Sequence, residues 1–236
     1  MIKKVSIVIP VFKEERTIRQ IISRVLTANT LGLTKEIIVV DDGSKDGTKK
    51  ILLGIKAKNV KIIFCKNNHG KGSALRTGFK KATGEIIIIQ DADLEYHPKD
   101  YPKLIRPILD KKTDIVYGSR ELSWKNIHSS IFFHFGGKII TEITNILYGS
   151  RLSDEATGYK VFRTEFLKKL PLKCKRFEFC PEVTALVLKK GGKILEVPNR
   201  YSARHRRDGK KIGVRDGISA ILTLLRIKMK GTLWQE

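Results

Sequence analysis

The chain has 236 residues, of which 41% are hydrophobic and 30% are charged, proportions that are ordinary for a folded globular domain. Its formal net charge of +23 predicts either an anionic partner (nucleic acid, nucleotide or acidic membrane) or a generally basic, solvated surface. No apolar segment approaches the roughly 18–20 residues that a membrane-spanning helix needs, so we exclude an integral membrane protein. The three cysteines form no CxxC pair, which predicts reduced thiols and excludes a zinc site or disulfide framework.

Short β-branched runs alternate with helical periodicity along the first half of the chain. The sequence predicts, in order, strand 5–11, helix 14–26, strand 36–44, helix 46–56, strand 60–67, helix 72–82, strand 85–93 and strand 114–120. Continuous Ile and Val runs are typical of strands that are buried on both faces. We therefore expect an α/β fold with a mostly parallel central sheet, right-handed crossovers and flanking helices.

The second half of the chain is less regular. Residues 124–148 are apolar and aromatic, with Gly136 and Gly137 in the middle, and residues 214–230 have the pattern of an amphipathic helix. Both segments are consistent either with helices that pack on the domain's own sheet or with helices that rest in a membrane interface. No internal repeat or low-complexity linker interrupts the sequence, so we expect a single domain over residues 1–236.

Acidic residues directly follow several of the predicted strands. Asp41 and Asp42 end the second strand, and Asp91 and Asp93 follow four consecutive isoleucines in the segment EIIIIQDADLEYHP. Ligands of parallel sheets bind beyond the carboxyl ends of the strands, so we expect these carboxylates to converge at one edge. The alternative is that they only make turns and cap helices. Together with Glu95, carboxylates spaced two apart predict a site for Mg²⁺ or Mn²⁺ that holds a diphosphate.

The glycine-rich segment NNHGKGSALRTG does not match either common nucleotide signature. It lacks the GxxxxGK[ST] pattern of a P-loop, and Leu75 occupies the place of the third glycine of GxGxxG. The segment either offers backbone N–H groups and Lys71 to an anion or is a plain helix start.

A basic run, RYSARHRRDGKK at 200–211, also allows two interpretations. It is either a solvated surface loop, or a lid over a diphosphate or a contact with acidic lipid. We expect no nucleic-acid partner, because the sequence contains no recognised DNA- or RNA-binding module and its aromatic residues are not interleaved with the basic run.

Seven motifs, taken in order, resemble the inverting glycosyltransferases of family 2, which have the GT-A fold. The motifs are VSIVIPVFKEE, EIIVVDDGSKDGT, NHGKGSALRTGFKKATGEIIIIQDADLEYHP, DIVYGSR, SDEATGYKVFR, FEFCPEVTALVLKKGGKILEVPNRYSAR and DGKKIGVRDG. The last three are similar to the branch that includes dolichyl-phosphate mannose synthase and bacterial polyprenyl-phosphate glucosyltransferases. The resemblance runs from about residue 4 to residue 226. It implies a Rossmann-like GT-A domain with a nucleotide-sugar-binding half at about 1–120 and an acceptor-side half at about 121–236.

The resemblance also implies roles for individual residues. The positions that match the family's nucleotide site are Pro10, Phe12, Glu14, Asp42 and Asp91. The metal positions are Asp91, Asp93 and Glu95, and Glu95 stands where the mannose synthases often carry Gln. The positions near acceptor phosphate or donor diphosphate are Lys71, Arg120 and Arg204. The implied catalytic positions are Asp93 and Asp154, the latter a candidate general base in members with hydroxyl acceptors.

We therefore expect an enzyme that uses Mg²⁺ or Mn²⁺ to move a hexose from a nucleotide sugar to polyprenyl or dolichyl phosphate. The donor would be of the UDP-glucose or GDP-mannose type. A lipid phosphate is already an anion, so it needs no base to remove a proton, and Asp154 and Glu182 would then orient sugar or acceptor or be structural. We expect a cytoplasmic protein, peripheral at the cytoplasmic face of an anionic membrane, with a membrane-anchoring protein as a candidate partner.

Two other hypotheses stay open on the sequence. The first keeps the donor chemistry but transfers the sugar to a hydroxyl group of a glycan, lipid or protein, with Asp154 as the base. The second is a basic binding protein that kept the fold and lost catalysis. It predicts no metal-dependent binding of a nucleotide sugar, and the presence of both Asp91 and Asp93 disfavours it.

Overall fold

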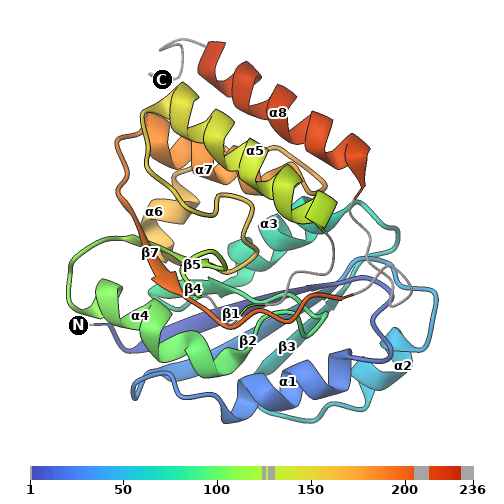
Figure 1. The fold of residues 1–236 in the computed structure, drawn as a ribbon. Helices are drawn as coiled ribbons and strands as arrows, with labels where there is room; N and C mark the ends of the chain where they lie inside the picture. Colours follow the sequence, from blue (N-terminus) through green and yellow to red (C-terminus); the bar gives the residue numbers. More distant parts are fainter. Residues whose placement is uncertain (1, 124–125, 127–130, 205–212, 230–236) are drawn as a thin grey trace.

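The described residues build a seven-stranded sheet with helices on both faces (Figure 1). This computed structural model describes residues 2–123, 126, 131–204 and 213–229. The strands lie in the order β3-β2-β1-β4-β6-β5-β7. Their bounds are β1 Lys4–Val11, β2 Thr34–Asp41, β3 Val60–Phe64, β4 Ile86–Ile89, β5 Ile115–Ser119, β6 Lys160–Arg163 and β7 Ile194–Pro198. Neighbouring strands are parallel, except that β6 runs antiparallel to both β4 and β5.

The predicted α/β fold with a mostly parallel sheet is confirmed, and β1 to β5 lie where the sequence predicts strands. The sequence does not predict β6 and β7. β6 is only four residues long and includes Lys160, whose side chain is fully buried. β7 is an edge strand whose residues are half-buried or exposed. Neither strand has the continuous apolar run that marks the centre of the sheet.

Helices cover both faces of the sheet. One face packs against α1 Ile18–Thr27, α2 Thr48–Leu53 and α4 Tyr101–Leu109, the last preceded by a 3₁₀ turn at Pro98–Asp100. The other face packs against α3 Lys71–Lys81, α6 Thr164–Lys168 and α7 Phe179–Lys189. In β1, Ile7 and Ile9 pack toward α1 and Val8 packs toward α3, because successive side chains of a strand point to opposite faces.

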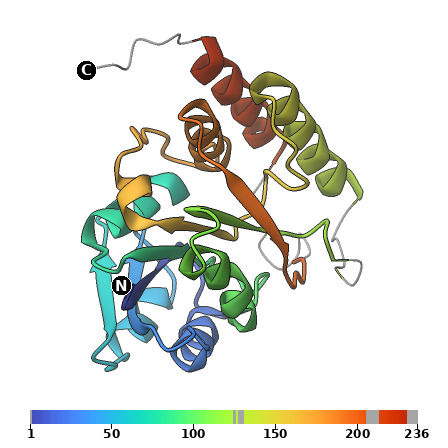
Figure 2. The same cartoon turned by 90° about the vertical axis from the view of Figure 1, so that its left-hand side faces the viewer.

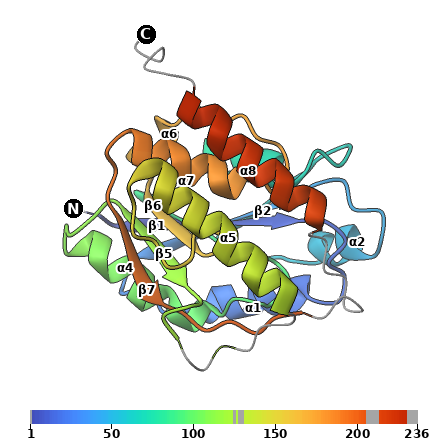
Figure 3. The same ribbon diagram turned by 45° about the horizontal axis from the view of Figure 1, so that its top comes forward.

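Two further helices, α5 Ile131–Tyr148 and α8 Val214–Met229, form an outer layer against α7 (Figure 2). Seen from above, they lie side by side over α7 (Figure 3). They account for the segments predicted at 124–148 and 214–230, although 124–125, 127–130 and 230 lie outside the described residues. Both helices pack on the domain, as the first interpretation of these segments predicts, and both also expose apolar side chains. A position in a membrane interface stays a prediction. In the described part of the chain, no helix has the length and apolarity to cross a bilayer.

Candidate active site

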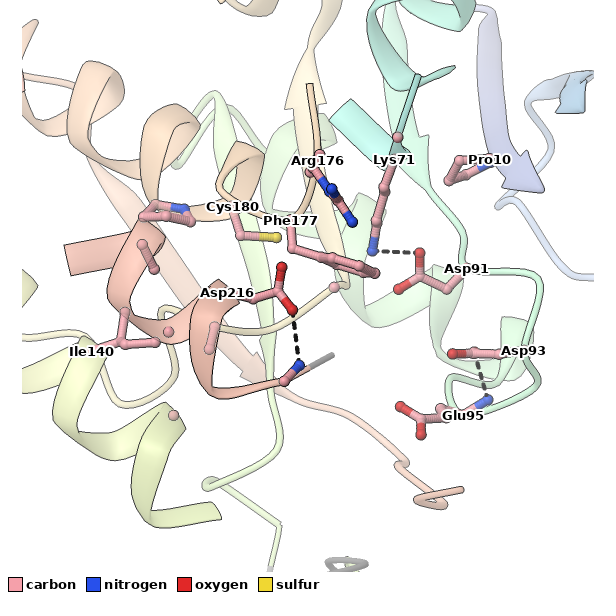
Figure 4. A pocket seen from close by; sticks show the side chains of 18 of the residues that line it. Pro10, Lys71, Asp91, Asp93, Glu95, Ile140, Arg176, Phe177, Cys180 and Asp216 are labelled. Atoms are coloured by element: carbon pink, nitrogen blue, oxygen red, sulfur yellow. Dashed lines mark hydrogen bonds and ion pairs between the residues drawn. The ribbon is translucent and has the colours of Figure 1, made fainter. Parts of the chain in front are cut away.

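A pocket of about 1060 Å³ lies at the carboxyl ends of β1, β2 and β4 and extends to α5 and α8 (Figure 4). The strand order places these three ends side by side, as the sequence predicts. All but one of the predicted site residues line this pocket, the exception being Asp154. Those that line it are Pro10, Phe12, Glu14, Asp42, Lys71, Asp91, Asp93, Glu95, Arg120 and Arg204.

The acidic turn after β4 is held by its own hydrogen bonds and by a neighbouring cation. Asp91 Oδ1 lies 2.6 Å from Lys71 Nζ, and Asp93 Oδ1 accepts the backbone N–H of Glu95 at 3.1 Å. Leu94, between Asp93 and Glu95, has a backbone φ of 67°, which tightens the turn. The turn therefore presents two aspartates to the pocket from a fixed backbone.

The Glu95 carboxylate is hydrogen-bonded to the segment 201–204. It accepts the Tyr201 hydroxyl at 2.9 Å and the backbone N–H of Arg204 at 2.8 Å. No three His, Cys, Asp or Glu side chains among the described residues are close enough together to hold a metal ion. The structure thus does not bring the predicted trio of Asp91, Asp93 and Glu95 into one metal-binding group, because Glu95 fixes the 201–204 segment instead.

The chemistry of Asp91 and Asp93 nevertheless suits a divalent cation. Burial and the like charges of Asp91 and Glu95 raise the pKa of Asp93 to about 7. A hard cation removes this repulsion, and Mg²⁺ commonly takes only one or two carboxylates and leaves its other positions to water and substrate phosphates. Two aspartates are therefore a sufficient protein contribution to such a site.

Four of the five residues predicted to bind the nucleotide lie at the β1 and β2 end of the pocket, and the fifth, Asp91, follows β4. Asp42 accepts the backbone N–H groups of His69 and Gly70, the latter at 2.6 Å, and so fastens the glycine-rich segment to the end of β2. Glu14 accepts the Thr17 hydroxyl at 2.7 Å and pairs with Arg204 at 2.8 Å. Both carboxylates thus already hold loops in place around the pocket.

Two N–H groups in the first turn of α3 are bonded to another loop and do not face the pocket as free donors. The N–H of Gly72 donates to the carbonyl of Arg176 at 3.2 Å, and that of Ser73 donates to the carbonyl of Lys175 at 2.9 Å. Of the two interpretations of this segment, a helix start that contributes only the Lys71 side chain fits the structure. The N–H groups of Gly72 and Ser73 are not available to an anion, because carbonyl groups of the loop after α6 accept them.

Asp154 lies beneath the pocket in a buried ion pair with Arg120. Its oxygens accept the backbone N–H of Arg120 at 2.9 Å and two guanidinium N–H groups at 2.7 and 2.6 Å. Burial alone would raise the pKa of Asp154, but the charge and hydrogen bonds of Arg120 outweigh it, and the pKa is lowered. A carboxylate so placed is a weak proton acceptor that orients Arg120.

Several pocket residues were not predicted. Arg176, Phe177 and Cys180 come from the loop after α6 and the start of α7, and Gly136, Gly137, Ile139, Ile218 and Ile221 come from α5 and α8. The motif beginning FEFCPEV marks this region in the sequence, but it contains no pattern that assigns a ligand. The basic run at 200–211 contributes Arg204, and its residues 205–211 lie outside the described residues.

Comparisons with known proteins agree with this geometry. Residues 6–171 match the family model described as Glycosyl transferase family 2. An uncharacterized protein of Methanocaldococcus jannaschii is 34% identical over 83% of this chain and 80% of its own length. A dolichol-phosphate mannosyltransferase of Pyrococcus furiosus is 31% identical and an undecaprenyl-phosphate 4-deoxy-4-formamido-L-arabinose transferase of Klebsiella pneumoniae is 30% identical, each over 89% of this chain. The chain spans 60% and 63% of the lengths of these last two relatives.

Solved structures show the same fold. Glucosyl-3-phosphoglycerate synthase of Mycobacterium tuberculosis, crystallised with UDP, matches with a TM-score of 0.73 at 20% identity, covering 96% of this chain and 80% of that protein. The same enzyme with Mg²⁺ and UDP matches with a TM-score of 0.73 at 19% identity, covering 95% of this chain and 79% of that protein. The fold, the strand-end acidic pocket and the match over residues 6–171 agree, and the chain belongs to glycosyltransferase family 2.

Proposed function

We propose that this glycosyltransferase moves a hexose from a nucleotide sugar to a polyprenyl-type lipid phosphate. One observation carries the proposal: a single pocket joins the acidic turn after β4 to an apolar surface between α5 and α8. Ile139 and Ile218 line this pocket and are also 54% and 55% exposed. An acceptor that carries a phosphate on an apolar tail suits both ends of this pocket: its phosphate would lie near the metal site at the acidic turn, and its tail would lie on the apolar surface. The names of the Pyrococcus and Klebsiella relatives, which contain dolichol phosphate and undecaprenyl phosphate, support the same acceptor class.

The proposed step is an inverting displacement at the anomeric carbon of the donor. An oxygen of the acceptor phosphate forms the new bond to this carbon while the bond to the nucleoside diphosphate breaks, and the electron pair leaves with the diphosphate. Cations at the pocket wall, including Lys71 and Arg204, stabilise the negative charge on the leaving group. No proton has to be removed from an acceptor that is already ionised, so the mechanism needs no general base.

Asp91 and Asp93 would hold the divalent metal ion of this reaction. When bound, Mg²⁺ or Mn²⁺ supplies positive charge to the diphosphate oxygens and lowers the cost of their release. The Mycobacterium enzyme of the same fold was crystallised with Mn²⁺ or Mg²⁺ together with UDP. Asp91 is paired with Lys71, so this lysine would be available to the diphosphate once Asp91 binds a cation.

The α5 and α8 surface would bring the pocket to the membrane that holds such an acceptor. Phe135, Ile139 and Ile146 of α5 and Ile218, Leu222, Leu225 and Met229 of α8 are exposed apolar side chains, and we call this set the outer apolar face. Exposed cations lie on the same helices, among them Lys138, Arg226 and Lys228. Apolar contact together with attraction to anionic lipid is the usual basis of peripheral binding. We propose a peripheral location at the cytoplasmic face, with a membrane-anchoring protein as a further partner.

A hydroxyl acceptor is less consistent with the pocket. Transfer to a hydroxyl group needs a base, and the predicted base Asp154 does not line the pocket and is held by three hydrogen bonds from Arg120. The geometry therefore favours an acceptor that arrives as an anion.

The test is transfer of label from a panel of UDP- and GDP-sugars, with Mg²⁺ or Mn²⁺, into extractable undecaprenyl phosphate. We expect one donor to label the lipid phase, and we expect chelator or Asp93→Ala to abolish the label. Asp110→Ala, at an exposed aspartate after α4, is the matched control and should keep activity. Metal-dependent donor binding without any lipid product would overturn the lipid-phosphate acceptor and point to a hydroxyl acceptor. Absence of donor binding would overturn the enzymatic proposal.

A further inference from the structure

Among the described residues, four basic side chains line the pocket, and three of them are paired with carboxylates. Lys71 pairs with Asp91 at 2.6 Å, Arg120 with Asp154 at 2.6 Å and Arg204 with Glu14 at 2.8 Å. The fourth, Arg176, donates only its backbone N–H, to Glu178, and its side chain forms no hydrogen bond or ion pair with any described residue. It is also exposed, so its guanidinium is available to a ligand.

The backbone that carries Arg176 is firmly held, although its side chain is free to contact a ligand. Its carbonyl accepts the N–H of Gly72 at 3.2 Å, and the carbonyl of Lys175 accepts the N–H of Ser73 at 2.9 Å. On the other side, Glu182 of α7 accepts the N–H groups of Lys173 and Cys174 at 2.7 and 3.0 Å. These bonds also show that Glu182 is a structural residue. The loop is thus clamped between α3 and α7, and Arg176 starts from a fixed position.

The direction of Arg176 is set by a close approach to the glycine-rich segment. A Cβ at Gly70 would lie 2.9 Å from Arg176 Cγ and 2.6 Å from the carbonyl oxygen of Lys175, so only glycine allows this packing. Figure 4 shows the guanidinium extending into the pocket beside the Lys71 side chain. Gly70 is bonded in turn to Asp42, so Arg176 lies at the end of the pocket where the nucleotide residues gather.

We infer that Arg176 binds a phosphate group of the substrates. The inference rests on the proposed function, since it assumes that a phosphate-bearing ligand enters this pocket. A planar guanidinium pairs with phosphate through two parallel hydrogen bonds, and this pairing needs a guanidinium that no carboxylate already occupies. The phosphate has two sources, the donor diphosphate and the acceptor phosphate. Contact with Gly70, beside Asp42, favours the donor diphosphate.

The test compares wild type, Arg176→Ala, Arg176→Lys and Lys175→Ala. Lys175 is the matched control, because it is exposed, adjacent in the chain and does not line the pocket. Calorimetric titration with UDP and GDP in the presence of Mg²⁺ measures the affinity for the nucleoside diphosphate of the donor. The Michaelis constant for undecaprenyl phosphate in detergent micelles tests whether Arg176 contributes to binding of the acceptor.

We expect Arg176→Ala to weaken binding of the preferred nucleoside diphosphate by about tenfold or more, with Lys175→Ala unchanged and Arg176→Lys in between, because lysine keeps the charge and loses the paired geometry. Unchanged nucleotide binding with a similar rise in the Michaelis constant for the lipid would assign Arg176 to the acceptor phosphate. If Arg176→Ala changes neither the nucleotide affinity nor the Michaelis constant for the lipid, while wild type binds nucleotide, the inference about Arg176 is overturned and the proposed function stands. A wild-type protein that binds neither nucleotide overturns the proposed function and this inference with it.

Discussion

Asp154 shows how strongly one neighbour can determine the chemistry of a buried carboxyl group. Burial alone would raise its pKa, but Arg120 lowers it below the ordinary value of about 3.9. A carboxyl group whose pKa is lower in the folded than in the unfolded protein stabilises the fold above its unfolded pKa. This contribution is lost as the pH falls through the folded pKa. The Arg120–Asp154 pair should therefore stabilise the protein at neutral pH and cease to do so in acid.

We predict that Asp154→Asn lowers the free energy of unfolding at pH 7 by about 3–5 kcal/mol, because it leaves the largely buried Arg120 without its counter-charge. Denaturant unfolding at pH 7 and at lower pH measures the effect. The difference between wild type and variant should begin to narrow as the pH falls below the unfolded pKa of about 3.9, and it should disappear only after the pH has fallen through the lower pKa of Asp154 in the folded protein. Asp110→Asn, at an exposed site, serves as the control. A difference that is the same at every pH would show that the charge of Asp154 does not stabilise the fold.

At the scale of elements, the contact between α3 and the loop after α6 connects the two halves of the pocket. Gly72 is the second residue of α3, and a Cβ there would lie 2.6 Å from the carbonyl oxygen of Cys174 and 3.0 Å from Phe179 Cβ. The first distance is too short for a side chain unless the backbone moves, and the second is tighter than an ordinary contact. Glycine at this position is therefore what allows the loop to dock on the helix.

We predict that Gly72→Ala destabilises the protein by about 1–3 kcal/mol, because the added methyl group overpacks the contact. Gly217→Ala in α8 is the matched control, since nothing lies within 4 Å of a Cβ built there. Alanine at this helical position should be neutral or stabilising by about 0.5–1 kcal/mol. Thermal unfolding of both variants measures the two effects. Equal shifts of the melting temperature in the same direction would contradict the docking argument.

At the scale of the whole molecule, the sequence predicts the donor side of the pocket better than the rest. Asp91 and Asp93 could be placed because each central strand is a continuous apolar run, and parallel strands bring their carboxyl ends to one edge. Arg176 and the pairing of Arg120 with Asp154 could not be predicted, because they depend on contacts between segments far apart in the chain. The short β6, inserted antiparallel between β4 and β5, has no periodic pattern that would reveal it.

The outer apolar face would set how the whole molecule is oriented on the membrane that the proposed function requires. Ile146 and Leu222 belong to this face, are 80% and 60% exposed and do not line the pocket. Burying one such side chain in lipid contributes about 1.5–3 kcal/mol, so a charged replacement should weaken vesicle binding by about tenfold or more. We therefore predict that Ile146→Glu and Leu222→Glu reduce co-sedimentation with anionic vesicles while nucleotide binding is retained.

Leu53→Glu provides the matched control for this prediction. Leu53 is 64% exposed on α2, which packs against the opposite face of the sheet, and it receives the same added charge. Its vesicle binding should change only through the lower net charge, an effect that salt screens. An equal loss in Leu53→Glu and Leu222→Glu would show that attraction between the basic protein and the lipid, without apolar contact, accounts for the binding. A loss confined to the α5 and α8 variants would establish that these helices face the membrane, with the pocket mouth at Ile139 and Ile218 turned toward the lipid.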